Sequence, residues 1–322
     1  MEKILIIGAG GQIGVELTLE LRKIYGRNNV VASDIREAHP LLLADNGPYE
    51  ILDVMDAKAV SALVQKEKIT QIYLLAAILS AKGEANPVWA WDINMQSLLN
   101  LLEIAREQKV RKFYWPSSIA AFGPTTPLQN TPQHTIIEPS TVYGISKYAG
   151  ELWCSYYFKR YGLDIRSLRY PGLISWKSAP GGGTTDYAID IYIEALKNKH
   201  YTCFLEENTY LPMMYMNDAI RATIELMEAP AEQIKNRLAY NLSAMTFSPK
   251  EIAESIKKHI PDFTIDYAPD FRQQIAAGWP DSIDDSEARA DWNWKHEFDL
   301  DKMTEDMLKN LAAKMKEEST VL

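Results

Sequence analysis

Tyr143 and Lys147 stand four residues apart in the middle of the chain. On a helix this spacing places both side chains on one face. A free phenol, with a pKa near ~10, is a poor base at neutral pH. A neighbouring ammonium and the positively charged ring of a bound cofactor would both favour the phenolate and lower that pKa toward the working range. The pair therefore indicates a proton-transfer site, although a tyrosine four residues before a lysine is, taken alone, more often a surface helix pair.

Such a site also needs a hydroxyl group that orients the substrate oxygen. A strand is predicted at 112–116, and Ser117 and Ser118 follow it directly. Side chains at the carboxyl end of a parallel strand face the ligand crevice of the sheet. Spacing does not separate the two serines, and one of them can simply bond to the backbone.

A glycine-rich turn opens the chain, with Gly8, Gly11 and Gly14 between a β-rich run and a helical segment. These positions allow a tight turn, a close approach of the backbone to a pyrophosphate, and close packing of the helix on the strand. Backbone N–H groups and the helix dipole then face the phosphates without a basic side chain. Glycines also serve ordinary turns, but this placement favours a dinucleotide site.

Asp34 ends the second predicted strand, twenty residues beyond Gly14. A carboxylate there can accept both hydroxyls of an adenosine ribose, and its charge would repel a 2′-phosphate, so NAD is expected as the cofactor rather than NADP. Arg36 weakens this preference, because an arginine can hold the extra phosphate. The alternative for Asp34 is a solvated strand end. Asp53 either binds the adenine amino group or caps the helix that follows at Asp56.

The elements that must position these residues alternate between strands and helices. Strands are predicted at 4–7, 30–33, 49–52, 72–75, 112–116 and 164–170, with segments of helical period between them. This alternation predicts an α/β fold with a doubly wound parallel Rossmann sheet, covered by helices on both faces.

After Pro171 the regular alternation gives way to mixed short strands and helices, which predicts a smaller, mainly C-terminal substrate lobe. We expect the dinucleotide-binding domain at 1–176, with returning segments near 213–243, and the lobe at 177–212 and 244–322. The Pro/Gly-rich stretch 178–183 is predicted to be a loop, either a lid over the site or a plain connection. The last helix is expected to turn inward Met303, Met307, Leu311 and Met315.

Composition excludes several classes of protein. The chain has 322 residues, is 47% hydrophobic and 24% charged, and carries a net charge of −9. These values exclude wholesale disorder and argue against nucleic acid or an anionic membrane as partner. The longest apolar run, 72–79, is too short to span a bilayer. Two cysteines, Cys154 and Cys203, and five histidines form neither a disulfide framework nor a zinc pattern. With no signal-peptide layout at its start, we expect a cytoplasmic protein without a metal.

The order of these signals resembles the extended short-chain dehydrogenase/reductase family, which includes sugar-nucleotide epimerases. The resemblance covers nearly the whole chain: the glycine turn, the acidic residue after the second strand, serine after the fifth, and Tyr-x-x-x-Lys. Other stretches resemble, more specifically, the short-chain type of NAD-dependent L-threonine 3-dehydrogenase; they are 79–84, 116–124, 169–172, 183–187 and 211–216.

This resemblance implies oxidation of the β-hydroxyl of L-threonine to 2-amino-3-oxobutyrate with formation of NADH. It implies that Tyr143 is the base, that Lys147 binds the ribose of the nicotinamide, and that Ser118 binds the substrate hydroxyl. It also implies a homodimer paired through helices near 87–108 and 143–161. The implied substrate pocket is Ser80, Ser118, Tyr143, Thr184, Thr185 and Trp279, where Trp279 could equally be core packing. The implied cofactor site is Gly8, Gly11, Gln12, Ile13, Gly14, Asp34, Asp53, Leu75, Ala76, Ala77, Tyr143, Lys147 and Tyr170.

Two other functions stay open. In a sugar-nucleotide epimerase or dehydratase the hydride returns to the substrate, and the resemblance places an arginine for the diphosphate where this chain has Leu211. Leucine cannot neutralise a diphosphate, which argues against that function. A non-catalytic NAD-binding module would keep the fold without a working proton-transfer set, and the intact Tyr143, Lys147 and Ser118 count against it.

Overall fold

Six parallel strands form the central sheet of the chain, which the computed structural model describes over residues 2–177 and 181–320. The strand order is β3-β2-β1-β4-β5-β7, so the order reverses between β1 and β4. In such sheets a ligand binds at the carboxyl ends of the strands on either side of the reversal. The strands are β1 (Ile4–Ile7), β2 (Val30–Asp34), β3 (Tyr49–Ile51), β4 (Gln71–Leu74), β5 (Lys112–Tyr114) and β7 (Asp164–Arg166).

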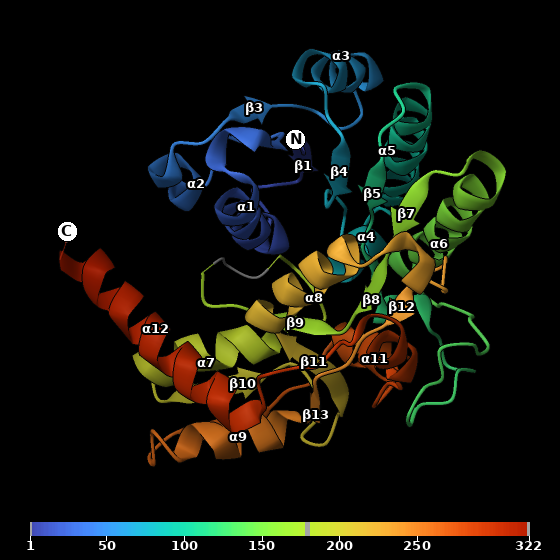
Figure 1. Cartoon of the computed structure of the whole chain (residues 1–322). Helices are drawn as coiled ribbons and strands as arrows, with labels where there is room; N and C mark the ends of the chain where they lie inside the picture. Colours follow the sequence, from blue (N-terminus) through green and yellow to red (C-terminus); the bar gives the residue numbers. More distant parts are fainter. Residues whose placement is uncertain (1, 178–180, 321–322) are drawn as a thin grey trace.

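Helices cover both faces of this sheet, as predicted (Figure 1). Alternate residues of β1 enter different cores, because successive side chains of a strand point to opposite faces. Ile4 and Ile6 pack with α1 (Gln12–Tyr25) and α8 (Met216–Glu228). Leu5 and Ile7 pack in a second core with α3 (Ala57–Glu67), α5 (Pro87–Glu107) and α6 (Val142–Tyr161). The doubly wound α/β fold is thereby confirmed.

The prediction of one strand over 164–170 is wrong. The chain leaves the central sheet after β7 and enters a three-stranded sheet as β8 (Leu168–Tyr170), between β6 (Ser117–Ser118) and β12 (Tyr240–Asn241). The segment 112–116 breaks in the same way: β5 ends at Tyr114, and Pro116, which has no N–H to donate, precedes β6. Both breaks bring Ser118 and Tyr170 into register on neighbouring strands.

The smaller lobe lies below the central sheet in the view of Figure 1. Strand β11 (Leu211–Tyr215) joins β9 (Gly172–Ile174) in parallel and β13 (Met245–Phe247) antiparallel, and β10 (His200–Cys203) pairs with β14 (Thr264–Tyr267). Helices α7 (Tyr187–Lys197), α9 (Pro249–Lys257) and α12 (Leu300–Thr320) pack with these strands. The shorter helices are η1 (Arg27–Asn29), α2 (Pro40–Asp45), α4 (Ser80–Glu84), η2 (Ile119–Ala121), η3 (Ala231–Gln233), α10 (Phe271–Ala276) and α11 (Ser286–Trp292).

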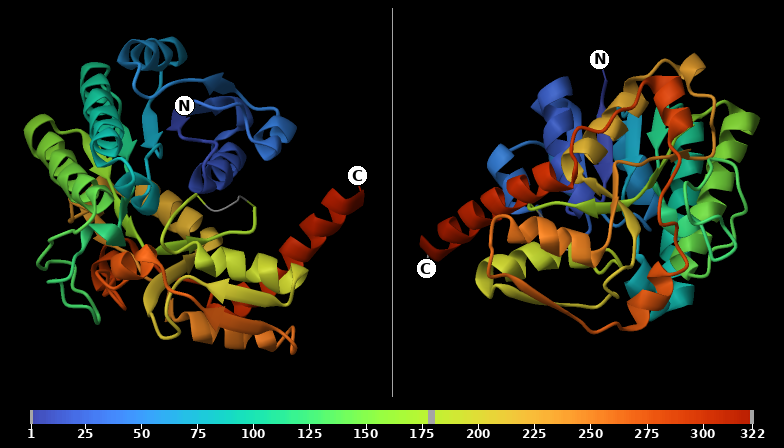
Figure 2. Two further views of the ribbon diagram at one scale, coloured as in Figure 1. Left: turned by 180° about the vertical axis from the view of Figure 1, so that it is seen from behind. Right: turned by 90° about the horizontal axis from the view of Figure 1, so that it is seen from below.

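The last helix follows the sequence pattern. Met303, Met307 and Leu311 are buried, while Met315 is half-buried, because the C-terminal end of α12 projects beyond the lobe (Figure 2). Within 213–243, α8 packs against α1. The exact domain boundaries stay a prediction.

None of the helices in the described part of the chain is both long enough and apolar enough to cross a membrane. The cytoplasmic location stays a prediction.

Arg166 ties the carboxyl end of α8 to the central sheet. Its buried guanidinium donates to the carbonyl oxygens of Leu226 (2.6 Å), Met227 (3.2 Å) and Ala229 (2.6 Å). These are carbonyls that a helix end leaves without an intrahelical donor. Asp164 pairs with the same guanidinium at 2.7 Å, so the buried charge is balanced.

We expect Arg166→Met to lower the free energy of unfolding by about 2–4 kcal/mol, because the carbonyls of Leu226 and Ala229 lose this donor and Asp164 keeps only Arg237 as a guanidinium partner. Urea unfolding followed by circular dichroism measures this change. Arg27→Met is the matched control: Arg27 is exposed and lies 3.8 Å from its partner, so its loss should leave the midpoint nearly unchanged. Equal midpoints for the two variants would contradict the role of Arg166.

Candidate active site

The glycine turn lies where β1 meets α1, and two of its positions accept no side chain. Gly8 has a φ of +91°, and a β-carbon there would lie 2.5 Å from the amide nitrogen of Ala76. A β-carbon on Gly14 would lie 2.2 Å from the carbonyl oxygen of Gly8. Backbone therefore packs directly on backbone, and Gly11 takes the N-cap position of α1. The first turn of α1 points its free N–H groups toward the crevice between β1 and β4.

Gln12 shows that this crevice is built for a ligand. Its amide nitrogen Nε2 is buried and has no hydrogen-bond partner in the described structure. A buried polar group without a partner is costly and calls for an explanation. A phosphate oxygen at the start of α1 would accept from this amide, so the turn fits a dinucleotide. Ile13 beside it is half-buried and packs against the core under α1.

Asp34 closes the far side of the turn. Its carboxylate is buried and accepts from the backbone N–H of Gly10 at 3.0 Å and from the N–H and Nε of Arg36, each at 3.1 Å. The acid therefore lies at the glycine turn, where a ribose would sit, rather than at a solvated strand end. Arg36 is held by Asp34, so its Nε does not face an extra phosphate.

Asp53 does not cap the following helix. Asp56 does so, with its side chain accepting from the N–H groups of Lys58 and Ala59. Asp53 is exposed and accepts from the N–H of Met55 at 2.9 Å. Its role toward an adenine stays a prediction.

Residues 75–77 line the other side of the crevice. The N–H groups of Leu75 and Ala76 both donate to the carbonyl of Ile7, at 2.8 and 3.1 Å, which draws this segment over the glycine turn. Ala77 follows and is half-buried. Tyr170 differs from the expectation in one respect: its phenol is buried between the hydroxyls of Tyr114 and Thr223, so only its main chain can face a cofactor.

The structure brings Lys147 under Tyr143. The Nζ of Lys147 is buried, donates to the carbonyl of Pro116 at 2.6 Å, and lies 4.5 Å from the ring centre of Trp115 and 5.3 Å from that of Tyr143. Thr141 caps α6 by accepting from the N–H of Gly144 at 3.0 Å, so Tyr143 lies in the first turn. The phenol and the ammonium share one face, as predicted.

The predicted fall in the phenol pKa combines an ammonium with a cofactor ring, and the ammonium alone does not bring it about. Burial raises the pKa of Tyr143 to about 12, although its hydrogen bond with Ser118 acts in the opposite direction. Burial also lowers the pKa of Lys147 to about 7. Loss of solvent penalises both charged forms, and here it outweighs the attraction between them. Ionisation of the phenol therefore needs a further positive charge in the crevice.

Ser117 and Ser118 point to different partners. Ser118 shares a hydrogen bond with the phenol of Tyr143 and accepts from the N–H of Ala120 at 3.2 Å. Ser117 is buried, and its hydroxyl donates to Glu151 at 2.5 Å. Of the two serines that sequence left open, Ser118 is the one that reaches the phenol.

The predicted substrate residues are brought together in part. The hydroxyls of Ser80 and Thr184 lie 3.3 Å apart and both side chains are buried. Thr185 is half-buried beside Gly172. Trp279 is buried in the same hydrophobic core against which Tyr143 packs, so both of its predicted roles stay open. Of the predicted loop 178–183, residues 178–180 lie outside the described residues.

Asn94 is a residue that sequence analysis missed. Its side chain accepts from the N–H of Ile78 at 2.7 Å and donates to the carbonyl of Ile78 at 3.0 Å and to the hydroxyl of Ser146 at 3.3 Å. It thereby fixes the segment after β4 to the catalytic helix α6. The sequence signal for Asn94 was a polar residue on the core-facing side of α5, where the other positions are mostly apolar.

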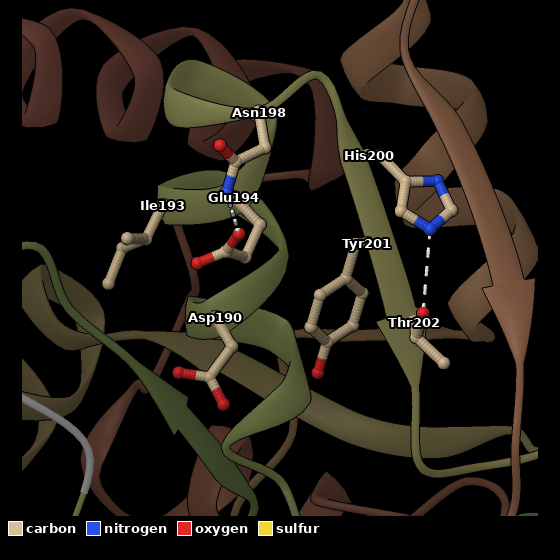
Figure 3. Close-up of a pocket in the computed structure, with 7 residues that line it drawn as sticks. All are labelled: Asp190, Ile193, Glu194, Asn198, His200, Tyr201 and Thr202. Carbon is tan, nitrogen blue, oxygen red and sulfur yellow. Dashed lines mark hydrogen bonds between the residues drawn. The ribbon is translucent and has the colours of Figure 1, made fainter.

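A hollow of the described surface lies elsewhere, between α7 and β10 (Figure 3). Its volume is about 580 Å³, and none of the predicted site residues lines it. Within residues 2–177 and 181–320 there is no group of three or more histidine, cysteine, aspartate or glutamate side chains that could hold a metal ion. The hollow is lined by Asp190, Ile193, Glu194, Asn198, His200, Tyr201 and Thr202.

Comparison with known proteins gives three kinds of match. Residues 4–243 match the model of the NAD dependent epimerase/dehydratase family. An uncharacterized epimerase/dehydratase of Staphylococcus haemolyticus is 51% identical over 315 residues, which cover 98% of this chain and 99% of that protein.

Solved structures extend the comparison. The holo form of a GalE-like L-threonine dehydrogenase from Cupriavidus necator is 57% identical and has a TM-score of 0.93, covering 96% of this chain and 99% of that one. A monomeric L-threonine 3-dehydrogenase from a metagenome, in its apo form, is 48% identical with a TM-score of 0.93, again covering 96% and 99%.

We expect Asp34→Ser to reduce the preference for NAD over NADP by about 10- to 100-fold, because the charge that repels a 2′-phosphate is removed. The ratio of kcat/KM for the two cofactors measures this preference. Asp56→Ser is the matched control, since serine also caps a helix and Asp56 lies outside the glycine turn. An unchanged ratio of kcat/KM in Asp34→Ser would show that Asp34 does not contact the ribose.

Proposed function

The chain belongs to the NAD-dependent epimerase/dehydratase family, and we propose that it oxidises the β-hydroxyl of L-threonine with NAD to 2-amino-3-oxobutyrate and NADH. The observation that carries this proposal is the buried ammonium of Lys147, whose Nζ lies 5.3 Å from the ring centre of Tyr143, with Ser118 close enough to the phenol to lower its pKa. This set lies beside a glycine turn that fits the cofactor. Structural relatives with more than half of their residues identical include an L-threonine dehydrogenase, which supports the choice of substrate.

The protein's own residues divide the work of this reaction. NAD, when bound, supplies the hydride acceptor and a positively charged ring. Ser118 orients the β-hydroxyl of the substrate by a hydrogen bond, and Tyr143 takes the hydroxyl proton as general base. Lys147 holds positive charge behind the phenol, against the carbonyl of Pro116. The hydrogen on the β-carbon leaves as hydride, so proton and electron pair depart in separate directions and charge balances.

The pocket suits a small zwitterion. Ser80, Thr184 and Thr185 offer neutral hydroxyls, which can orient an ammonium and a carboxylate without placing a net charge in the protein interior. Trp279 would supply an apolar wall at the edge of the same core as Tyr143. These substrate contacts are part of the proposal.

The two alternatives are disfavoured by specific residues. Leu211 is buried in β11, so no cation stands where a nucleotide diphosphate would need one. A non-catalytic module would need no hydrogen bond between Tyr143 and Ser118, and no buried ammonium below them.

We also propose a homodimer paired through α5 and α6. These helices expose large apolar side chains, which an isolated chain would leave in water. Since one relative at 48% identity is monomeric, the fold itself does not require pairing. The exposed side chains are Val88, Trp89, Trp91, Ile145, Leu152, Trp153, Tyr156 and Tyr161.

We expect Tyr143→Phe to lower kcat with L-threonine by about 10²- to 10⁴-fold, because it removes the proton acceptor. NAD affinity, measured by calorimetric titration, should stay within about twofold, since the glycine turn is intact. Initial rates of NADH formation measure kcat.

Tyr192→Phe serves as the matched control for this experiment. It also removes a buried phenolic hydroxyl, which bonds to Thr304 at 2.8 Å in the smaller lobe, so its kcat should stay near that of the unchanged protein. A Tyr143→Phe protein that turns over as fast as Tyr192→Phe would refute the base assignment.

We expect Trp153→Glu to convert a dimer to a monomer, because a charge would be buried at the centre of the apolar face. Sedimentation velocity measures the mass. The same substitution at exposed Phe271, Phe271→Glu, lies outside α5 and α6 and should leave the mass unchanged. A monomeric unchanged protein at micromolar concentration would overturn this proposal.

A further inference from the structure

A third polar residue continues the catalytic face of α6. Tyr143, Lys147 and Glu151 follow one another at intervals of four residues, so they lie in one row along the helix. Glu151 is fully buried, with 0% of its surface exposed. A buried carboxylate is costly unless it is paired and hydrogen-bonded, so its partners indicate its purpose.

Glu151 has two such partners. Its Oε1 accepts from the hydroxyl of Ser117 at 2.5 Å and from the Nε of Arg169 at 2.8 Å. Its Oε2 accepts from the Nη2 of Arg169 at 2.7 Å. Arg169 is also 0% exposed and stacks over the ring of Phe122 at 5.0 Å. The bidentate pair is charge-balanced, and its one neutral partner is the serine that precedes Ser118.

Through Arg169 this pair reaches the smaller lobe. The Nη1 of Arg169 donates to the carbonyl of Gln133 at 3.2 Å and to the side chain of Asn241 at 3.1 Å. Asn241 in turn donates to the carbonyl of Asp284 at 3.1 Å. Asp284 lies five residues beyond Trp279, so one buried network joins α6, β6 and the segment that carries the predicted pocket wall.

The surroundings of Lys147 contain one carboxylate. From α6, Tyr143, Glu151 and Cys154 face its ammonium, and from the end of β5 the ring of Trp115 and the carbonyl of Pro116 do. From β8, Arg169 stands behind Glu151. Burial lowers the pKa of Lys147, and the charges of Cys154 and Glu151 raise it. Because burial raises the pKa of the Cys154 thiol far above neutrality, the negative charge near Lys147 comes from Glu151, which pairs with Arg169 at 2.7 Å.

We propose that Glu151 is a positioning residue with two tasks, holding Ser118 in place through Ser117 and keeping Lys147 charged from one turn along α6. The proposal rests on the proposed function, since Tyr143, Lys147 and Ser118 are the groups that it serves. Arg169 and Glu151 form a bidentate ion pair, in which each balances the buried charge of the other.

The first test removes the hydroxyl of Ser117. In Ser117→Ala we expect kcat with L-threonine to fall about 10- to 100-fold, with KM changed by less than about threefold, because Ser118 is displaced rather than removed. Ser255→Ala is the matched control: its buried hydroxyl also donates to a carboxylate, Asp301, at 2.7 Å, but in the smaller lobe. Equal kcat in the two variants would overturn the first task.

The second test removes the charge of Glu151. Glu151→Gln keeps the shape and an acceptor for Ser117, and should lower the pKa of Lys147 by about one unit. Nuclear magnetic resonance of ¹⁵N-lysine, with the Lys147 signal assigned by its loss in Lys147→Met, measures this pKa without substrate. The rising limb of kcat against pH should move to higher pH, because a neutral Lys147 no longer favours the phenolate.

The outcomes separate a positioning role from a merely structural one. An unchanged Lys147 titration with an unchanged pH profile overturns the second task, even if the variant is less stable. If Glu151→Gln does not fold, the pair Glu151→Gln/Arg169→Gln removes both buried charges, and a smaller downward shift is expected because the positive charge of Arg169 is lost as well. A shifted Lys147 titration in a protein that forms no NADH from L-threonine would support the second task of Glu151 and contradict the proposed function.

Discussion

The active site depends on one constraint, the burial of the Lys147 ammonium beneath a tyrosine. A charge removed from water needs fixed partners, and this one has the carbonyl of Pro116 and the faces of two aromatic rings. Those partners come from the end of β5 and from α6, so satisfying the ammonium sets the distance between helix and sheet. The phenol of Tyr143 and the hydroxyl of Ser118 meet as a consequence of that distance.

The same constraint links the phenol to the cofactor. Burial raises the pKa of Tyr143 to about 12 and lowers that of Lys147 to about 7, so the ammonium alone does not make the phenol a base at neutral pH. Positive charge added in the crevice favours the phenolate. The reversal of strand order between β1 and β4 puts the glycine turn beside this pair, which is how the fold couples cofactor binding to proton transfer.

Much of this fold follows from patterns within short stretches of sequence. The features that could not be predicted depend on contacts between residues far apart in the chain. The alternation of strands and helices, the glycine turn and the Tyr143–Lys147 spacing depend on neighbours in sequence. The break at Ser167 depends on pairing with β12, more than seventy residues later, and no local period shows it. The choice of Ser118 over Ser117 rests on Glu151, and the role of Asn94 on Ile78 and Ser146. Sequence spacing shows the charge that neighbours Tyr143 but not the loss of solvent that raises the pKa of its phenol.

The most direct measurement compares NADH formation by the purified protein with L-threonine, L-serine and a UDP-hexose as substrates. The structure predicts NADH accumulation with L-threonine, because Tyr143, Ser118 and Lys147 can remove a proton. It predicts none with the UDP-hexose, because Leu211 provides no positive charge for a diphosphate. Interconversion of the UDP-hexose without NADH formation from L-threonine would contradict the account.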